Sequence, residues 1–222
     1  MRFVNSNIYW KIRSVHRKNR ARLFREFVMD MPRPVRILDI GGTQAFWITS
    51  ELAVEEEIHV TLLNIEPQSV SLPNFQAITA DGTGADFLGD REFDVVFSNS
   101  AIEHCGDYGK QRTMAYEIQR LGHRYWVQTP NYWFPIEPHF LFPCFHWFPV
   151  LLRAVLIRFV SLGWYNKRTN FRDAFEAADS VHLLSARHLR TLFPKGILLR
   201  ERVFGFTKSL IICSGFPDDQ KT

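Results

Sequence analysis

Short apolar runs along the chain predict the buried strands of a parallel sheet. The run Val35–Ile40 ends in Gly41-Gly42, a pattern typical of a buried strand followed by a tight turn. Similar runs predict further strands at residues 58–65, 75–79, 93–97 and 124–128. Helical spacing appears between several of them, from Gln44 to Val54 and from Lys110 to Leu121. This alternation predicts an α/β fold in which helices cover both faces of a mostly parallel sheet.

The two ends of the chain depart from this alternation. Residues 1–30 predict a basic amphipathic helix, because apolar residues recur at near-helical spacing among many Lys and Arg side chains. Residues 185–193 predict a compact helix with Ser185 as its N-cap. The runs Ile197–Val203 and Thr207–Cys213 flank a Phe-Gly-Phe turn, which predicts an antiparallel hairpin. We therefore expect one doubly wound domain over residues 31–222, preceded by the basic helix.

An aromatic insertion occupies residues 131–180 and lacks clean alternation. Its segment 139–164 is strongly apolar, but Pro143 and Pro149 interrupt any long helix, and Arg153 and Arg158 would lie at membrane depth. These features argue against a transmembrane span. Three hypotheses stay open: the insertion walls a pocket for an apolar acceptor, rests on a membrane surface through residues 139–168, or fills the core and an oligomer interface.

The composition indicates a globular protein with one main core. The chain has 222 residues, of which 46% are hydrophobic and 23% are charged. Its three cysteines are far apart, so we expect no disulfide framework and no metal site. Free cysteines are typical of the cytoplasm, so we expect a cytoplasmic protein, with peripheral binding to the inner membrane surface as an open alternative. The net charge is +4, and the basic residues near the start favour either phosphate binding or the solvated face of a helix.

The ends of the first two predicted strands carry candidate cofactor-binding residues. In a doubly wound sheet, ligands bind beyond the carboxyl ends of the strands. Asp39, Gly41 and Gly42 close the first strand, where glycine lets the backbone approach a ligand. Asn64 and Glu66 lie at the end of the second strand, where a hydrogen-bond acceptor can bind both hydroxyls of a ribose. The sequence leaves open which of the two residues serves.

Two later strand ends complete this set. Asp81-Gly82 follows the third strand, where a carboxylate can accept a hydrogen bond from an adenine amino group. The fourth strand ends at Asn99 in a run of small polar residues that could line a reacting centre. We expect these side chains to lie close together, because the carboxyl ends of parallel strands share one edge of the sheet.

Together the four segments resemble those of class I S-adenosylmethionine (SAM)-dependent methyltransferases, of the broad group called type 11. The resemblance runs from about Val35 to Cys213, although the first loop lacks the third glycine that the family usually carries. It implies a Rossmann-like sheet of seven strands, the last antiparallel, with SAM as cofactor. A Thr-Pro-Asn…Glu-Pro-His stretch at residues 129–139 resembles that of enzymes acting on small-molecule, lipid or glycan acceptors.

Histidines near the expected acceptor site are the candidate catalytic groups. Methyl transfer from a sulfonium needs a base only where the acceptor keeps its proton at neutral pH, as hydroxyls do. His139 is the first candidate, oriented by Glu137, and His104 is the second. The alternatives are a nucleic-acid methyltransferase, which the absence of an RNA-binding module disfavours, and a non-catalytic protein that keeps the fold.

Overall fold

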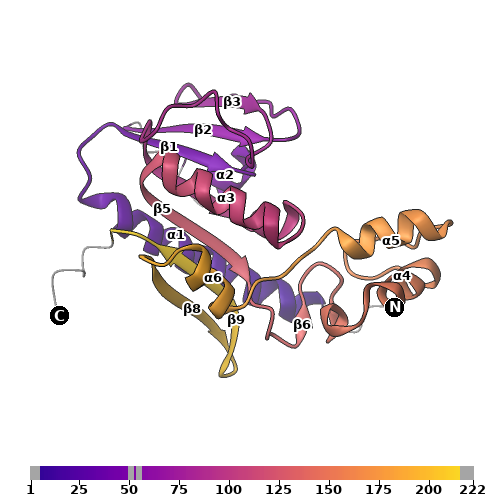
Figure 1. Cartoon of the computed structure of the whole chain (residues 1–222). Helices are drawn as coiled ribbons and strands as arrows, with labels where there is room; N and C mark the ends of the chain where they lie inside the picture. The colour runs from indigo at the N-terminus through magenta and orange to yellow at the C-terminus, as the bar shows by residue number, and fades with distance from the viewer. Residues whose placement is uncertain (1–5, 50–52, 54–56, 216–222) are drawn as a thin grey trace.

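Seven strands form one sheet in the computed structural model, which describes residues 6–49, 53 and 57–215. Their order across the sheet is β3-β2-β1-β4-β5-β9-β8, and only β9 and β8 add antiparallel pairs (Figure 1). The predicted doubly wound sheet and its closing antiparallel hairpin are thus confirmed. The strands are β1 Val35–Ile40, β2 Ile58–Asn64, β3 Phe75–Thr79, β4 Phe93–Asn99, β5 Gly122–Pro130, β8 Ile197–Val203 and β9 Phe206–Cys213.

Helices cover both faces of this sheet, as the alternation predicts. The helices are α1 Ser6–Met29, α2 Gln44–Thr49, α3 Tyr108–Leu121, α4 Val150–Phe159, α5 Phe171–Asp179 and α6 Ala186–Leu192, with short 3-10 turns η1 Ile102–His104 and η2 Phe145–Trp147. Buried residues of α3 and α6, such as Ile118 and Leu189, pack on one face. Buried residues of α1 and α2, such as Phe24 and Trp47, pack on the other. The sheet therefore lies between two apolar layers.

Aromatic side chains hold α1 against the sheet. Phe24 contacts Phe97 of β4 and Trp126 of β5 edge-on, with ring centroids 4.7 and 5.6 Å apart. Phe27, which is fully buried, lies 5.4 Å from the same tryptophan. Such aromatic pairs add about 0.5–1.5 kcal/mol each beyond simple burial. The second half of the basic helix is thus part of the core, whereas Val15 nearer its start is exposed.

The ends of several predicted elements differ from the expectation. Helix α3 begins at Tyr108 rather than Lys110, because the Asp107 side chain accepts a hydrogen bond from the Lys110 amide and caps the first turn. Ser185 caps α6 in the same way, as predicted. Residues 65–74 and 80–92, which connect β2 to β3 and β3 to β4, contain no helix. The predicted helix 44–54 is seen to Thr49, and most of its remainder lies outside the described residues.

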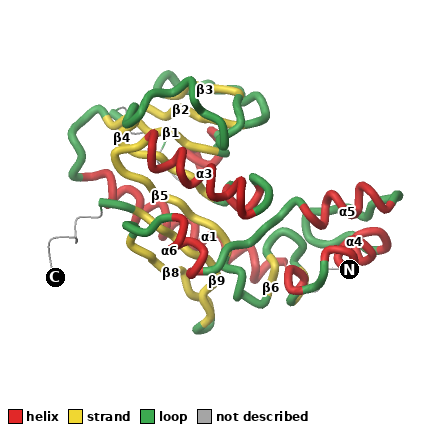
Figure 2. The backbone as a smooth tube through the Cα atoms, in the orientation of Figure 1, coloured by secondary structure: helices red, strands yellow, loops and turns green. Residues whose placement is uncertain are grey.

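The aromatic insertion forms an arm that projects beside the sheet (Figures 1 and 2). It contains the short strands β6 Ile136–Glu137 and β7 Phe142–Pro143, then η2, α4 and α5. The arm has a small core of its own, which includes Phe140, Phe145 and Ile157. Pro149 precedes α4, so the proline starts this helix rather than breaking it. Asn131 and Leu184 pair at its base, so the chain enters and leaves the arm at one place.

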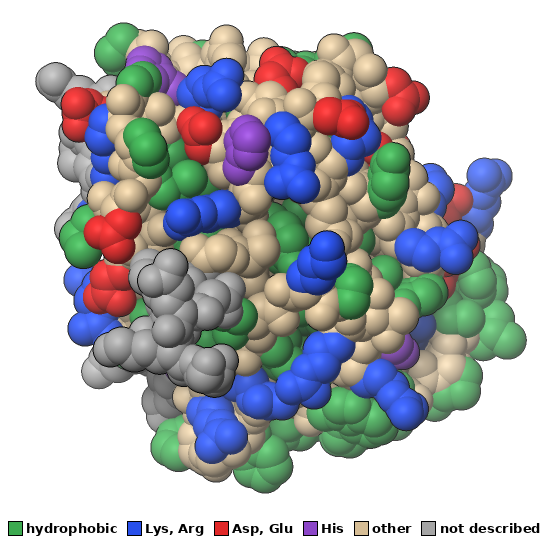
Figure 3. Space-filling model, turned by 60° about the vertical axis from the view of Figure 1, so that its left-hand side comes forward, with side chains coloured by type: hydrophobic (Ala, Val, Ile, Leu, Met, Phe, Trp, Pro, Cys, Tyr) green, Lys and Arg blue, Asp and Glu red, His purple; other side chains and the backbone are tan. Residues whose placement is uncertain are grey.

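Charged side chains are unevenly distributed on the face shown in Figure 3. Lys and Arg side chains are spread over this face, whereas Asp and Glu side chains lie mainly in its upper part and along its left edge, so basic side chains predominate in its lower part. Among the described helices, none combines the length and the hydropathy needed to cross a bilayer.

Candidate functional site

The candidate site lies where the order of strands reverses, between β1 and β4. From this point the chain places β2 and β3 on one side and β4 and β5 on the other. Gly41 follows β1 with a φ of +79°, and a Cβ there would lie 2.4 Å from the Cβ of Ala101, just beyond β4. Only glycine therefore lets these two loops meet. Crevices at such reversal points are where doubly wound proteins bind ligands.

Two cavities lined by described residues adjoin at this site. The first lies over the ends of β1, β2 and β3, and we call it the strand-end cavity. Its volume is about 500 Å³. The predicted residues Gly41, Asn64, Asp81, Gly82 and His104 all contribute to its wall, together with Ile40, Leu63, Ala101 and Met114. The structure thus brings together all four predicted segments, the fourth through Ser100, Ala101 and His104 after β4. Its apolar wall with a few polar groups is typical of a small-molecule site.

Asn64 and Glu66 differ in their positions relative to this cavity. Asn64 lines it, and its side chain donates to the Gly42 carbonyl at 3.0 Å and accepts from the Glu66 amide at 3.1 Å. Glu66 itself is exposed and lines neither cavity of this site. Asp81 accepts two hydrogen bonds from Thr83 at 2.8 Å, and the backbone one holds the pKa of Asp81 below its usual value. Asp81 is therefore an ionised acceptor at neutral pH.

The second cavity lies between the sheet edge, α1 and the arm, and we call it the arm cavity. Its volume is about 450 Å³. Gly41 and Ser100 line both cavities, so the two spaces adjoin at the strand reversal. Its wall includes the predicted residues Asp39, Gly42, Asn99 and His139, and from the arm Phe134, Ile136, Pro138 and Trp164. The insertion does wall a pocket.

Asp39 is a buried carboxyl group beside the arm cavity. Only 1% of it is exposed, and its Oδ2 accepts a hydrogen bond from the Trp47 indole at 2.7 Å. Oδ1 has no hydrogen-bond partner in the part of the chain that the structure describes. Burial raises the pKa of Asp39 to about 7, although the Trp47 hydrogen bond opposes this rise. A Cβ on Gly42 would overlap the Asp39 carboxylate, so Gly42 keeps space around that group. Asp39 is thus poised to ionise when a cation approaches.

Arg20 is a site residue among the basic residues near the start of the chain, for which the sequence leaves phosphate binding and a solvated helix face both open. In the structure its guanidinium donates to Asn99 at 2.5 Å, to Gln128 at 2.8 Å and to both carboxylate oxygens of Glu201. Asn99, predicted to bind the cofactor, thus uses its side-chain oxygen to accept from Arg20. No local pattern marks Arg20 as different from the other basic residues of α1, because its partners come from three distant strands.

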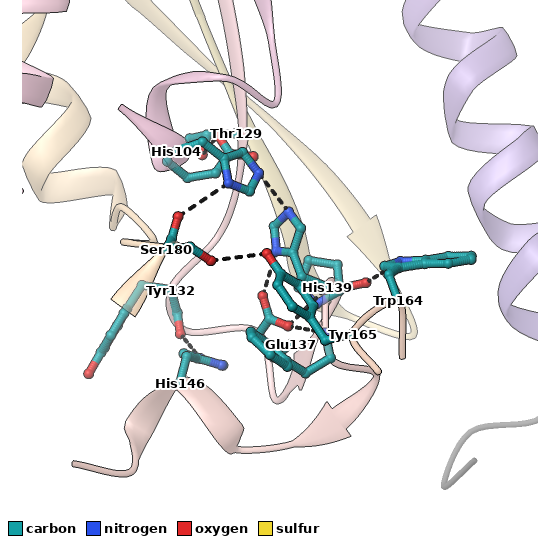
Figure 4. A network of polar contacts seen from close by, with 12 residues as sticks. His104, Thr129, Tyr132, Glu137, His139, His146, Trp164, Tyr165 and Ser180 are labelled. Carbon is teal, nitrogen blue, oxygen red and sulfur yellow. Dashed lines mark hydrogen bonds and ion pairs between the residues drawn. The ribbon is translucent and has the colours of Figure 1, made fainter. Parts of the chain in front are cut away.

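Glu137, His139 and His104 form a chain of contacts at the junction of arm and sheet (Figure 4). The buried Glu137 carboxylate accepts from His139 Nδ1 at 2.7 Å and from the amides of His139 and Phe140. His139 Nε2 lies 3.2 Å from His104 Nε2, and His104 Nδ1 lies 3.3 Å from the Ser180 carbonyl. The three predicted catalytic candidates are therefore neighbours. His139 lines the arm cavity and His104 the strand-end cavity, so the histidine pair lies between the two.

Comparison with curated proteins finds two relatives, and no family model matches the chain. The relatives are the uncharacterized proteins MT1557 and Rv1509 of two Mycobacterium tuberculosis strains. Each is 26% identical over 142 residues, which cover 56% of this chain and 47% of the relative. The chain thus spans about half the length of these relatives.

Solved structures share the fold at low sequence identity. A SAM-dependent methyltransferase from Archaeoglobus fulgidus matches with a TM-score of 0.54 at 13% identity, over 94% of this chain and 99% of its own. The N-terminal domain of EvdMO1, solved with S-adenosylhomocysteine (SAH) and D-fucose, matches with a TM-score of 0.54 at 16% identity, over 90% and 82%. The N-methyltransferase NodS from Bradyrhizobium japonicum, solved with SAH, matches with a TM-score of 0.51 at 13% identity, over 91% of this chain and 87% of its own. This chain has the Rossmann-like fold of class I methyltransferases.

Proposed function

We propose that the protein is a SAM-dependent methyltransferase that acts on a small-molecule, lipid or glycan acceptor. The observation that carries this proposal is the pair of cavities that adjoin at Gly41 and Ser100, over the strand reversal. One cavity suits a nucleoside, and the other suits an acceptor that approaches from the side of the arm. Methyl transfer requires such an arrangement, because both reactants must meet in line at one carbon atom.

The strand-end cavity is the proposed site of the adenosine of SAM. Asp81 would accept from the adenine amino group, and Asn64 would face the ribose, because it lines the cavity whereas Glu66 does not. The methionine end would pass Gly41 and enter the arm cavity. Its ammonium group would then lie near Asp39, whose unpartnered Oδ1 gains a hydrogen-bond donor there.

The acceptor would occupy the arm cavity, with its nucleophilic atom near the histidine pair. When a hydroxyl attacks, the new oxygen–methyl bond forms as the sulfur–methyl bond breaks, and the electron pair of that bond stays on sulfur. The hydroxyl proton passes to His139, whose ring orientation the Glu137 carboxylate holds at 2.7 Å. Alignment of the reacting atoms alone can supply about 7–11 kcal/mol of the barrier reduction.

The structural neighbours support methyl transfer and leave several acceptor classes open. CurJ is a carbon methyltransferase, NodS is an N-methyltransferase, and EvdMO1 was solved with a sugar. The apolar side chains of the arm favour an acceptor with a hydrophobic part. The sugar in EvdMO1 supports the inclusion of glycans.

Binding of SAH by the purified chain tests this proposal directly. We expect calorimetry to show one SAH per chain, and we expect Asp81→Ala to weaken binding about tenfold, the loss of one charge-assisted hydrogen bond. Asp86→Ala is the matched control, because Asp86 is an exposed aspartate that lines neither cavity. A folded wild-type chain that does not bind SAH would contradict the proposal and favour a non-catalytic role.

A further inference from the structure

We propose that Glu103, His104 and His139 bind one divalent transition-metal ion, with Zn²⁺ as the best match. The inference rests on the proposed function and refines the role of the histidine pair in it. Among the described residues, these three bring one ligand atom each to within 4.8 Å of one another. From the sequence we expect no metal site, because the three cysteines are far apart and form no pair of zinc ligands.

The spacing of the two histidines fits a shared ion. Their Nε2 atoms are 3.2 Å apart, and their ring planes are nearly perpendicular, at 85°. Two nitrogen ligands of a tetrahedral zinc ion, each about 2.05 Å from the metal, are roughly 3.3 Å apart. The histidine pair therefore has the separation that a zinc ion imposes.

The outer nitrogens of both rings already have acceptors. His139 Nδ1 donates to the Glu137 carboxylate, and His104 Nδ1 donates to the Ser180 carbonyl, which can only accept (Figure 4). When Nδ1 carries the proton of a neutral ring, Nε2 presents a lone pair. Two such lone pairs that face each other repel unless a proton or a cation lies between them. Histidine ligands of metals are held in this way, with a carboxylate or a carbonyl on the outer nitrogen.

Glu103 supplies an acidic ligand from the buried side of the cluster. Its side chain is completely buried, and Oε2 accepts from the Thr129 hydroxyl at 2.9 Å. Oε1 is also buried and has no hydrogen-bond partner among the described residues. A buried carboxylate oxygen without a partner is costly, and a bound cation would satisfy it. This orphaned oxygen is the second, independent sign of a ligand.

Three protein ligands leave one position of a tetrahedral ion open. Catalytic zinc sites have this composition, and the open position takes water or substrate. His139 borders the arm cavity, so an acceptor hydroxyl there could occupy that position. A bound divalent ion would lower the pKa of such a hydroxyl, whose proton would pass to solvent water and leave the oxygen as the nucleophile. With the ion bound, His139 would act as a metal ligand. The ion, rather than the imidazole of His139, would then activate the acceptor hydroxyl.

Titration of the chelator-treated, purified chain with Zn²⁺ and with Co²⁺ tests the site without any acceptor. We expect one ion per chain by calorimetry, and visible Co²⁺ absorption typical of tetrahedral coordination. His104→Ala, His139→Ala and Glu103→Gln should each weaken binding at least tenfold, the loss typical of a removed ligand or its support. His123→Ala is the control, because His123 is exposed at the start of β5 and lines neither cavity.

Circular dichroism and SAH titration of the same proteins keep the outcomes distinct. Absence of binding in the folded wild-type chain, or equal binding by wild type and all three variants, would overturn the metal site. SAH binding retained in either case would leave the proposed function standing. Conversely, a chain that binds Zn²⁺ through these residues and fails to bind SAH would retain the metal site and lose the methyltransferase proposal.

Discussion

Arg20 of α1 forms a bidentate ion pair with Glu201 of β8, although the two residues are 181 positions apart in the chain. Nε lies 3.1 Å from Oε1 and Nη2 lies 2.6 Å from Oε2, with only 11% and 8% of the two side chains exposed. The remaining nitrogen of Arg20 donates to Asn99 and Gln128. One guanidinium thus joins α1 to β4, β5 and β8 at the wall of the arm cavity.

Arg20→Ala should strongly destabilise the protein, because it leaves the Glu201 carboxylate buried without its cation. Loss of one partner of a buried ion pair typically costs about 3–5 kcal/mol in the free energy of unfolding. Urea denaturation followed by circular dichroism measures this change. Arg22→Ala is the control on the same helix, because Arg22 is 70% exposed and lies 3.9 Å from its partner Glu26. A change in the control as large as that of Arg20→Ala would contradict the assignment.

Asp39→Asn should stabilise the protein above neutral pH and not at low pH. Burial raises the pKa of Asp39 to about 7 in the folded chain, so the folded form binds its proton more tightly than the unfolded chain does. The stability that this group contributes is therefore complete below the ordinary aspartate pKa of about 4 and is lost progressively as the pH rises through 7. Asparagine cannot ionise and can still accept from Trp47.

Urea denaturation at pH 5 and pH 8 measures this difference. We expect Asp39→Asn to be more stable than wild type at pH 8 by roughly 1–4 kcal/mol, with the gap closing toward pH 5. The same substitution should weaken SAH binding at pH 8, because the proposed partner of the ligand's ammonium group loses its charge. A stability difference that does not change with pH would show that Asp39 ionises normally in the folded protein.

His139→Ala should slow methyl transfer and leave SAH affinity unchanged. Loss of a positioned proton acceptor typically lowers the rate about 10²–10⁴-fold. Glu137→Gln should slow transfer less, because the amide keeps an oxygen for the backbone donors and loses the charge that orients the imidazole. Turnover of an identified acceptor under saturating SAM measures both effects, with His123→Ala as the unaffected control. Wild-type turnover by His139→Ala would remove this residue from the reaction.

The arm should bind membranes that carry negative charge. Leu151, Val155 and Phe159 form an exposed apolar stripe at four-residue spacing on α4, and Lys167 and Arg168 lie exposed after that helix. Co-sedimentation with vesicles that contain phosphatidylserine measures binding, with neutral vesicles for comparison. We expect Phe159→Asp to reduce binding. Phe204→Asp, at the exposed hairpin turn, should not, and an equal loss in both variants would contradict a specific role for the arm.

The positions of the strands could be predicted because each strand has a local pattern of apolar residues followed by a turn. A buried parallel strand must be apolar along its length, and the turn after β1 must contain a residue that tolerates a positive φ. The apolar strand Val35–Ile40 meets the first condition, and Gly41, with its φ of +79°, meets the second. The same reasoning placed Asp81 and Asn64 at the carboxyl edge, since strand ends that share an edge converge whatever their spacing in the chain. The positions of the four predicted segments at one edge of the sheet could therefore be predicted from the sequence.

The tertiary structure alone decided which polar side chains meet. Arg20 looks like any other basic residue of an amphipathic helix, and its selection depends on Glu201, Asn99 and Gln128, which come from three other elements. Glu103 lies in a segment whose pattern marks only the end of β4, and it becomes a candidate metal ligand only because the arm places His139 beside His104. Local patterns report burial and turns, because these act on neighbouring residues, whereas contacts between distant segments are set by the packing of the whole fold.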